Sequence, residues 1–249
     1  MKMKVMLVGL VAVASLAVGQ PKVKSKNEQA AVKAVFDAQT PDAKIAAVDA
    51  LIAKFKDTEF KAVALEQAAE AAQQKGDSAG AIVYGDRALE ADPKNFQAML
   101  LVSGQLALGT KEFDLDKDEK EKRATKLAND AIATITAAAK PNPALADEQW
   151  AGIKKDLIAQ AHETLGLIAS VDKKYDVAIT EFKTAIDGAA NPEPTTMLRL
   201  AATYNYAKQY DLGSAMADRV LALPNVPDNF KKIAMDEKQR AAKLKAGQK

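Results

Sequence analysis

Apolar positions recur at helical spacing along most of the chain. After the turn at Gly76 and Asp77, apolar or small residues stand at Ala81, Ile82, Gly85, Ala88 and Leu89. Spacings of three and four residues place such positions on one face of a helix that has 3.6 residues per turn. Asp, Gly, Asn and Pro separate helical segments of about 12–18 residues. The pattern predicts an all-α protein.

The residues near the N-terminal end of the chain indicate where its first two helices begin and end. Residues 20–27 read as a polar linker, and residues 28–38 as a short leading helix. Thr40 and Pro41 suit the start of the next helix, because a hydroxyl accepts a free backbone N–H and proline is tolerated at the first helical position. We therefore expect a linker and leading helix over 20–40, and regular helix pairs after it.

The spacing of the 76–93 stretch returns further along the chain. It recurs at Tyr175, Ala178, Phe182 and Ala185, preceded by Leu165 and Gly166. This resembles the tetratricopeptide (TPR) repeat, which has a period of about 34 residues on two antiparallel helices. The positions that carry the resemblance and pack the repeats together are Ala81, Ala88, Leu165, Gly166, Tyr175, Ala178, Phe182, Ala185, Leu200, Ala201, Tyr204 and Tyr210.

The resemblance implies a right-handed α-solenoid of antiparallel helix pairs over residues 41–226. The expected units are a half repeat at 41–58, then 62–93, 96–139 with an insertion near 110–122, 145–192 and 194–226. Each pair exposes an apolar face that only the next pair can cover, so the pairs must stack. Gly213 stands where the repeat has alanine, which is expected to weaken its helix.

Residues 227–246 are predicted to form a helix that caps the stack. Phe230, Ile233, Ala234, Ala241 and Leu244 share its apolar face. A terminal repeat needs a polar outer side, and charged residues supply it here. The alternative is a helix that lies on a membrane surface, but its apolar face lacks tryptophan and Asp236 and Glu237 interrupt it.

The N-terminus has the features of a secretory signal. Lys2 and Lys4 precede an apolar run from Val5 to Val18, and small residues lead up to Gly19. Spanning a bilayer takes about 20 apolar residues, so this run is short for a retained anchor. We expect residues 1–19 to be a cleaved signal peptide, and the mature protein to be periplasmic or secreted. The alternatives are an uncleaved membrane anchor and a cytoplasmic protein whose N-terminus is apolar by chance.

Composition narrows the possible chemistry. The chain has no cysteine and one histidine, His162, so disulfides, thiolate sites and a histidine-based metal site are disfavoured. Removing Lys2 and Lys4 from the 35 basic residues leaves 33, which equals the number of acidic residues. A neutral chain does not favour nucleic acid, which attracts a concentrated basic surface. We expect no cofactor and no metal.

Three features could carry a function of their own. Asp114, Asp116 and Asp118 alternate as at the start of a calcium loop, but Glu119 stands where that loop needs glycine and Thr125 where it needs glutamate. A solvated turn is the preferred interpretation.

His162 falls where the repeat has a large aromatic residue, so we expect it to be a packing residue. Trp150 suits both an exposed binding anchor and the edge of the stack.

In TPR proteins the first helices of the repeats line a concave face. The resemblance places twelve residues there: Glu66, Glu70, Gln73, Gln97, Leu100, Leu108, Gln160, Glu163, Leu167, Leu198, Asn205 and Tyr206. The carboxylates of Glu66 and Glu70 disfavour a groove that clamps acidic peptide tails. A peptide with some basic character is the expected guest.

The sequence predicts a non-catalytic scaffold that binds a peptide segment or partner protein in the cell envelope. The alternative is an accessory subunit, or an enzyme that uses carboxylates carried on helices. Pairs of Asp and Glu one helical turn apart are numerous, and nothing marks one of them as special. An enzyme would need a closed pocket with convergent polar groups, whereas a scaffold would show an open groove.

Overall fold

The computed structural model describes residues 21–247, so the expected signal peptide at 1–19 lies outside the described residues. Within this range the chain is helical and contains no strand. The helices are α1 (Lys26–Asp37), α2 (Pro41–Lys54), α3 (Lys61–Gln74), α4 (Ser78–Ala91), α5 (Phe96–Gly109), α6 (Lys117–Ala137), α7 (Asp147–Val171), α8 (Tyr175–Gly188), α9 (Pro194–Tyr206), α10 (Tyr210–Ala222) and α11 (Asp228–Ala246). None of these helices is long and apolar enough to cross a membrane.

Side-chain caps fix several helix starts. The Thr40 hydroxyl accepts a hydrogen bond from the Ala43 N–H at 3.2 Å, and Pro41 occupies the first position of α2. Asp77 caps α4 in the same way, and the side-chain oxygen of Asn95 accepts the Ala98 N–H of α5 at 2.9 Å. Such caps satisfy backbone donors that have no partner inside the helix, so these residues set where each pair begins.

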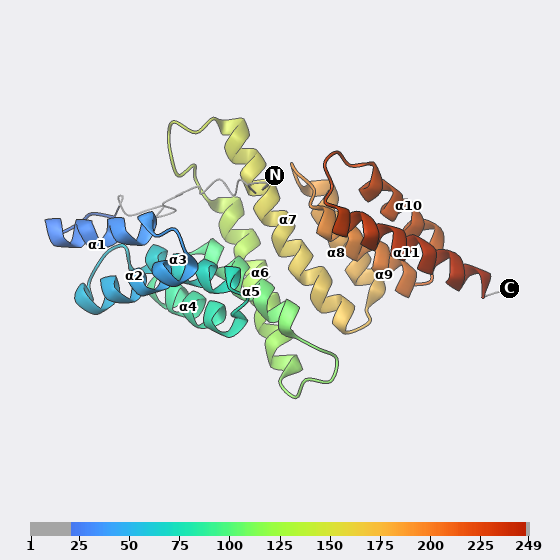
Figure 1. Ribbon diagram of the computed structural model, residues 1–249, viewed down its shortest axis with the longest axis horizontal. Coiled ribbons are helices and arrows are strands. Elements are labelled where there is room, and N and C mark those ends of the chain that lie inside the picture. Colours follow the sequence, from blue (N-terminus) through green and yellow to red (C-terminus); the bar gives the residue numbers. More distant parts are fainter. Residues whose placement is uncertain (1–20, 248–249) are drawn as a thin grey trace.

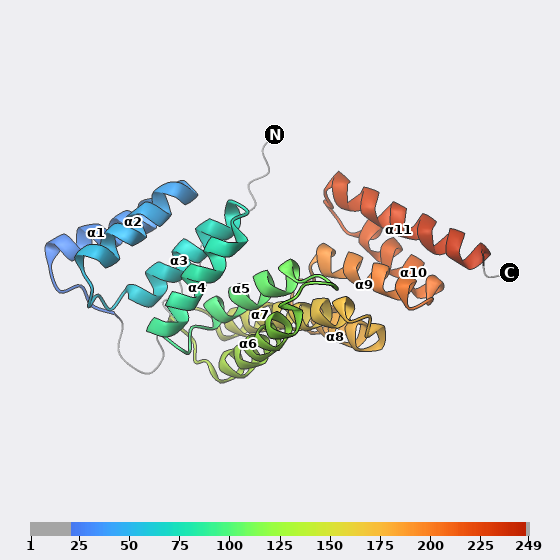
Figure 2. The ribbon, with the colours of Figure 1, turned by 90° about the horizontal axis from the view of Figure 1, so that it is seen from below.

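The helices stack in consecutive pairs into an arc. Each helix contacts the next one along the chain, and first helices of neighbouring pairs also meet, as α3 does with α5 and α5 with α7. Figure 2 shows α1–α4 on one arm, α5–α8 at the base and α9–α11 on the other arm. The arc is open on one side, and the two ends of the stack lie far apart (Figure 1). This is the all-α solenoid that the repeats predicted.

Small residues let neighbouring helices approach closely. A Cβ atom on Gly166 of α7 would lie 2.7 Å from the ring of Phe182 on α8, and one on Gly85 of α4 would collide with Val102 of α5. Ala81, Ala88, Gly166, Ala178, Phe182, Ala185, Leu200, Ala201, Tyr204 and Tyr210 are buried, whereas Leu165 and Tyr175 are half-buried. The core is therefore narrow and continuous between units, as expected for alanine-rich helices.

The structure adds to two expectations about single elements. The leading helix expected at 28–38 is α1, and its Val32 and Val35 are buried with Val48 and Leu51 of α2, so the segment expected as a half repeat belongs to a first helix pair. Gly213 does not interrupt α10. It is buried, and an added Cβ would collide with the side chain of Asn205 on α9, so glycine is required there by close packing.

The segment expected as an insertion is partly helical. Residues 117–122 form the first turns of α6, which leaves 110–116 as the connecting loop. Asp118 and Glu119 lie in the first turn of α6, where acidic side chains interact favourably with the helix dipole. The charged residues of this region therefore have a local structural role at the helix start.

The last helix, α11, packs against α9 and α10 at the end of the stack. Ala234 and Ala241 are buried and Phe230 is partly buried. Ile233 and Leu244, expected on the same covered face, are 44% and 41% exposed. The reason is that the face of α11 that meets the stack is a narrow stripe through Phe230, Ala234 and Ala241, so Ile233 and Leu244 remain at its border.

Candidate functional site

The twelve residues expected in the groove divide into two groups. Glu70, Gln97, Glu163 and Leu167 are half-buried, and Gln73, Leu108, Gln160 and Tyr206 are exposed. Leu100 and Leu198 are buried and belong to the core, Leu100 with Trp150 and Leu198 with Met197. These two leucines are part of the apolar core, so in this structure they are not available to a guest.

Glu66 and Asn205 are also buried, and each is held by a specific partner. The Asn95 side-chain amide donates to Glu66 Oε2 at 2.8 Å, and burial raises the pKa of Glu66 to about 8. The Asn205 amide donates to the backbone oxygen of Glu237 at 3.1 Å and to its carboxylate at 2.8 Å. Both residues join neighbouring units instead of lining an open surface.

A cavity of about 400 Å³ opens beside α7, α8 and α9. Arg199, Ala202, Thr203 and Tyr206 line it from one face of α9, because residues three and four apart share a face. Leu167 lies among the lining residues of α7. We call this space the α7–α9 cavity. Two of the predicted groove residues, Leu167 and Tyr206, line it.

Aromatic rings form one wall of this cavity. The rings of Tyr175 and Tyr206 stack with their centroids 5.7 Å apart and their planes 11° from parallel. The guanidinium of Arg240 on α11 lies 4.2 Å from the Tyr206 centroid, which is close enough for a cation–π interaction. Tyr206 remains 51% exposed. The sequence did not indicate Arg240, because its position depends on how α11 crosses α9.

The charged groups around the cavity are paired. Arg199 makes an ion pair with Glu163, and Lys173 Nζ lies 2.6 Å from Glu112 Oε1 of the loop before α6. Their charges cancel locally, so the cavity offers hydrogen-bonding groups and aromatic surface without a strong net charge. The carboxylates of Glu112 and Glu163 are therefore neutralised by Lys173 and Arg199.

The three other candidate features have structural partners. His162 Nδ1 lies 2.7 Å from Glu181 Oε2, so the histidine links α7 to α8. Asp114 and Asp116 both pair with Lys120, at 3.4 Å and 2.8 Å. Among residues 21–247, no group of three or more His, Asp or Glu residues is arranged to hold a metal ion.

Trp150 belongs to the core in this structure. It is 8% exposed and packs in a cluster with Phe96, Ala131 and Ile135, which belong to α5 and α6. Lys154 covers its ring at 5.9 Å from the centroid. Of the two interpretations of this residue, the structure supports packing at the edge of the α6–α7 contact.

No protein-family model matches the chain, and no curated protein sequence matches it. A crystal structure of a thermophilic TPR protein from Thermus thermophilus matches it in three dimensions with a TM-score of 0.57. The two sequences are 16% identical, and the match covers 84% of this chain and 98% of that one. Together with the stacked helix pairs, this likeness shows that the chain has the TPR-like α-solenoid fold.

Proposed function

We propose that the protein is a non-catalytic scaffold that binds a peptide segment or partner protein on the concave side of its solenoid. The observation that carries this proposal is the half-exposed Tyr206, stacked on Tyr175 under Arg240 beside an open cavity. Tyrosine and arginine are enriched among residues that dominate binding energy at protein interfaces. The solenoid fold supports the proposal, because such stacks present extended surfaces to partners.

The cavity favours a guest without strong charge. Glu66 is buried and Arg199 neutralises Glu163, so this side of the solenoid presents less negative charge than the sequence indicated. An exposed aromatic surface next to hydrogen-bonding groups suits a segment that carries an apolar side chain and leaves backbone groups free to bond. We propose a mostly neutral, partly apolar segment as the guest of the α7–α9 cavity.

Site-specific photo-cross-linking in the native cells tests this function. A photoreactive amino acid replaces one residue at a time: Tyr206 in the cavity, Leu108, which is another exposed residue of the predicted groove, or the control residue Val83, which is 56% exposed on α4. We expect the same partner to be linked from Tyr206 and Leu108 and not from Val83. A partner linked equally well from all three positions, or only from Val83, would show that the partner does not bind in the groove.

A substitution tests the contribution of the aromatic wall. Tyr206→Ala is expected to weaken binding of the linked partner by roughly tenfold or more, as truncation of a central aromatic residue does at interfaces. Val83→Ala serves as the matched control on α4 and is expected to leave binding unchanged. Equal affinities of the two variants would show that the guest does not use Tyr206.

We also propose that the scaffold acts in the cell envelope, because residues 1–19 have the composition of a signal peptide. The mass of the intact protein purified from its native cells tests this. Loss of residues 1–19 is the expected result. A full-length protein in the membrane fraction would instead support the uncleaved anchor, and a full-length soluble protein would place it in the cytoplasm.

A further inference from the structure

The loop between α5 and α6, residues 110–116, presents two large apolar side chains to solvent. Phe113 is 86% exposed and Leu115 is fully exposed. Figure 1 shows this loop projecting from the body of the solenoid. Two large apolar side chains exposed within one short projecting loop are surface of the kind that a contact with another molecule can bury.

The loop is held in a defined conformation. The Lys111 N–H donates to Asp114 Oδ2 at 3.1 Å, and the Thr110 hydroxyl donates to the backbone oxygen of Leu106 at 2.7 Å. Lys120 pairs with Asp114 from the first turn of α6. Because these bonds order the loop in advance, little conformational entropy is lost when its apolar side chains are buried against a partner.

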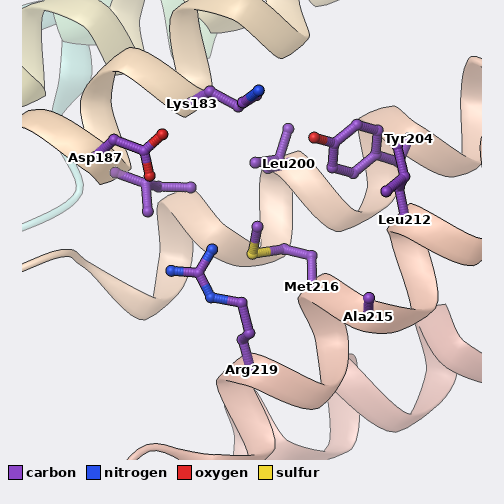
Figure 3. Close-up of a pocket in the computed structure, with 9 residues that line it drawn as sticks. Lys183, Asp187, Leu200, Tyr204, Leu212, Ala215, Met216 and Arg219 are labelled. Atoms are coloured by element: carbon purple, nitrogen blue, oxygen red, sulfur yellow. The ribbon is translucent and has the colours of Figure 1, made fainter.

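A pocket with matching properties lies on another part of the solenoid. It has a volume of about 250 Å³ and is bounded by α8, α9 and α10. Leu200, Tyr204 and Met216 supply its apolar lining, and the half-exposed Leu212 stands at its border (Figure 3). We call it the α8–α10 pocket. Its volume is sufficient for one large apolar side chain.

The charges at this pocket complement those of the loop. Lys183 and Arg219 lie at the pocket together with Asp187 (Figure 3), and neither cation makes an ion pair with another residue of the described chain. Residues 111–118 contain four acidic and two basic residues, and the Asp116 side chain is 57% exposed. Glu112, Asp114 and Asp116 already pair with Lys173 and Lys120, so the attraction to the pocket comes from the excess of acidic over basic residues in this segment, with Asp118 exposed. Both cations of the α7–α9 cavity are paired.

The loop cannot be the guest of its own pocket in this structure. Phe113 is exposed, and the pairing of Glu112 with Lys173 ties the loop to the turn between α7 and α8. A second copy of the chain, however, presents the same loop with Phe113 and Leu115 exposed. We propose that the protein self-associates head to tail, with Phe113 of one copy in the α8–α10 pocket of the next and the acidic residues of the loop near Lys183 and Arg219.

Such a contact uses different surfaces on the two copies. Every copy in the assembly then has one loop and one pocket engaged, except at the ends, so the contact generates rings or open chains. The α7–α9 cavity is lined by other residues, apart from Glu112 of the loop. The inference therefore goes beyond the proposed binding function and is tested separately from it.

Sedimentation velocity of the purified chain over a range of concentrations tests the contact. We expect association that increases with protein concentration and weakens as salt is added, because salt screens the charges at the rim. Phe113→Ala combined with Leu115→Ala is expected to raise the dissociation constant by roughly ten- to a hundredfold, as expected for the loss of buried apolar side chains. Val83→Ala, an exposed change on α4, is expected to leave it unchanged.

Mixing two variants provides a sharper test. Lys183→Glu with Arg219→Glu damages the pocket and leaves the loop intact, whereas the loop variant keeps the pocket. Each variant alone is expected to be monomeric, and a mixture is expected to give a one-to-one heterodimer that does not grow further. A chain that stays monomeric up to millimolar concentration, assembly unaffected by both variants, or a mixture without heterodimer would overturn the proposal.

Discussion

At the scale of single residues, Glu66 couples stability to pH. Its side chain is 4% exposed, and the Asn95 amide that donates to it also caps α5. Burial is the main cause that raises its pKa to about 8, and the carboxylates of Glu70 and Asp92 raise it further. The folded chain therefore keeps Glu66 protonated at neutral pH, whereas in the unfolded chain the group ionises near its ordinary pKa of 4.5.

Replacement by glutamine should remove this pH dependence. In the unmodified chain, the contribution of Glu66 is fully present below pH 4.5 and is lost as the pH rises through 8, because the unfolded chain releases the proton first. Glu66→Gln keeps an acceptor for Asn95 without a charge. Relative to the unmodified chain, we expect it to gain roughly 1–3 kcal/mol of unfolding free energy between pH 5 and pH 9.

Denaturant unfolding at pH 5, 7 and 9 measures this difference. Glu90→Gln, an exposed change on α4, is the matched control and should run parallel to the unmodified chain. Burial also raises the pKa values of Glu70, Glu121 and Glu193, so the comparison is between the variants and the unmodified chain at each pH. If Glu66→Gln showed no relative gain towards high pH, the carboxyl would not be buried in solution.

For Gly213, packing predicts that alanine lowers the unfolding free energy, whereas helix propensity predicts that it raises it. Alanine normally stabilises a helix interior by up to about 1 kcal/mol relative to glycine. At Gly213, however, the added methyl would collide with the Asn205 side chain and lie 3.0 Å from the Ala201 carbonyl oxygen. We expect Gly213→Ala to lower the unfolding free energy by roughly 1–3 kcal/mol. Gly104→Ala, which meets only Thr164 at 3.9 Å, should be neutral or stabilising.

Thermal and denaturant unfolding of both glycine variants tests this pair. Stabilisation by alanine at both positions would mean that α9 and α10 lie further apart in solution than in the structure. Destabilisation at both would instead show that α5 tolerates no added methyl. Both glycines lie inside a helix, so the change in backbone propensity is similar. The difference between the two variants therefore measures the effect of close packing at Gly213.

At the scale of elements, α11 is held by a narrow contact. Ala234 and Ala241 are buried against the stack, and Glu237 accepts the Asn205 amide of α9. Ala234→Glu would place a charge without a partner in this contact, which costs several times the energy of an ordinary surface change. We expect α11 to separate from α9 and α10 while the earlier helices stay folded.

Hydrogen exchange measured by mass spectrometry follows this separation. Amides of α11 should exchange at least tenfold faster in Ala234→Glu, whereas amides of α3 to α5 should not change. Ala242→Glu puts the same charge on an exposed position of the same helix and is the control. Unchanged protection of α11 in the Ala234 variant would contradict the narrow contact.

The sequence predicted helix faces better than it predicted which faces are covered. Ala178 and Phe182 could be placed in the core from their helical spacing, and Gly166 from the resemblance to the TPR pattern. Leu198 and Asn205 could not be placed in this way, since the next unit and α11 cover them. The same limit applies to Tyr206 and Arg240, whose contact depends on the crossing of two helices distant in sequence.

At the scale of the whole molecule, the arc is built from contacts between neighbours. Among the described residues, four apolar clusters follow one another along the stack, and the one around α7 to α11 shares no buried residue with the one around α1 to α5. In such stacks stability is close to a sum over units and the interfaces between adjacent units. Damage to one unit should therefore remain local, unlike damage to a single compact core.

Phe182→Ala tests this property. Phe182 is 1% exposed and fills the space against Gly166 between α7 and α8. Removing its ring should cost roughly 3–5 kcal/mol in that unit. Hydrogen exchange should then show lost protection in α7 to α10 and unchanged protection in α2 to α4, whereas Val177→Ala, an exposed change on the same helix, should alter neither. Uniform loss across all helices would mean that the chain unfolds as one cooperative body, because only then does a defect in one pair reach helices that do not touch it.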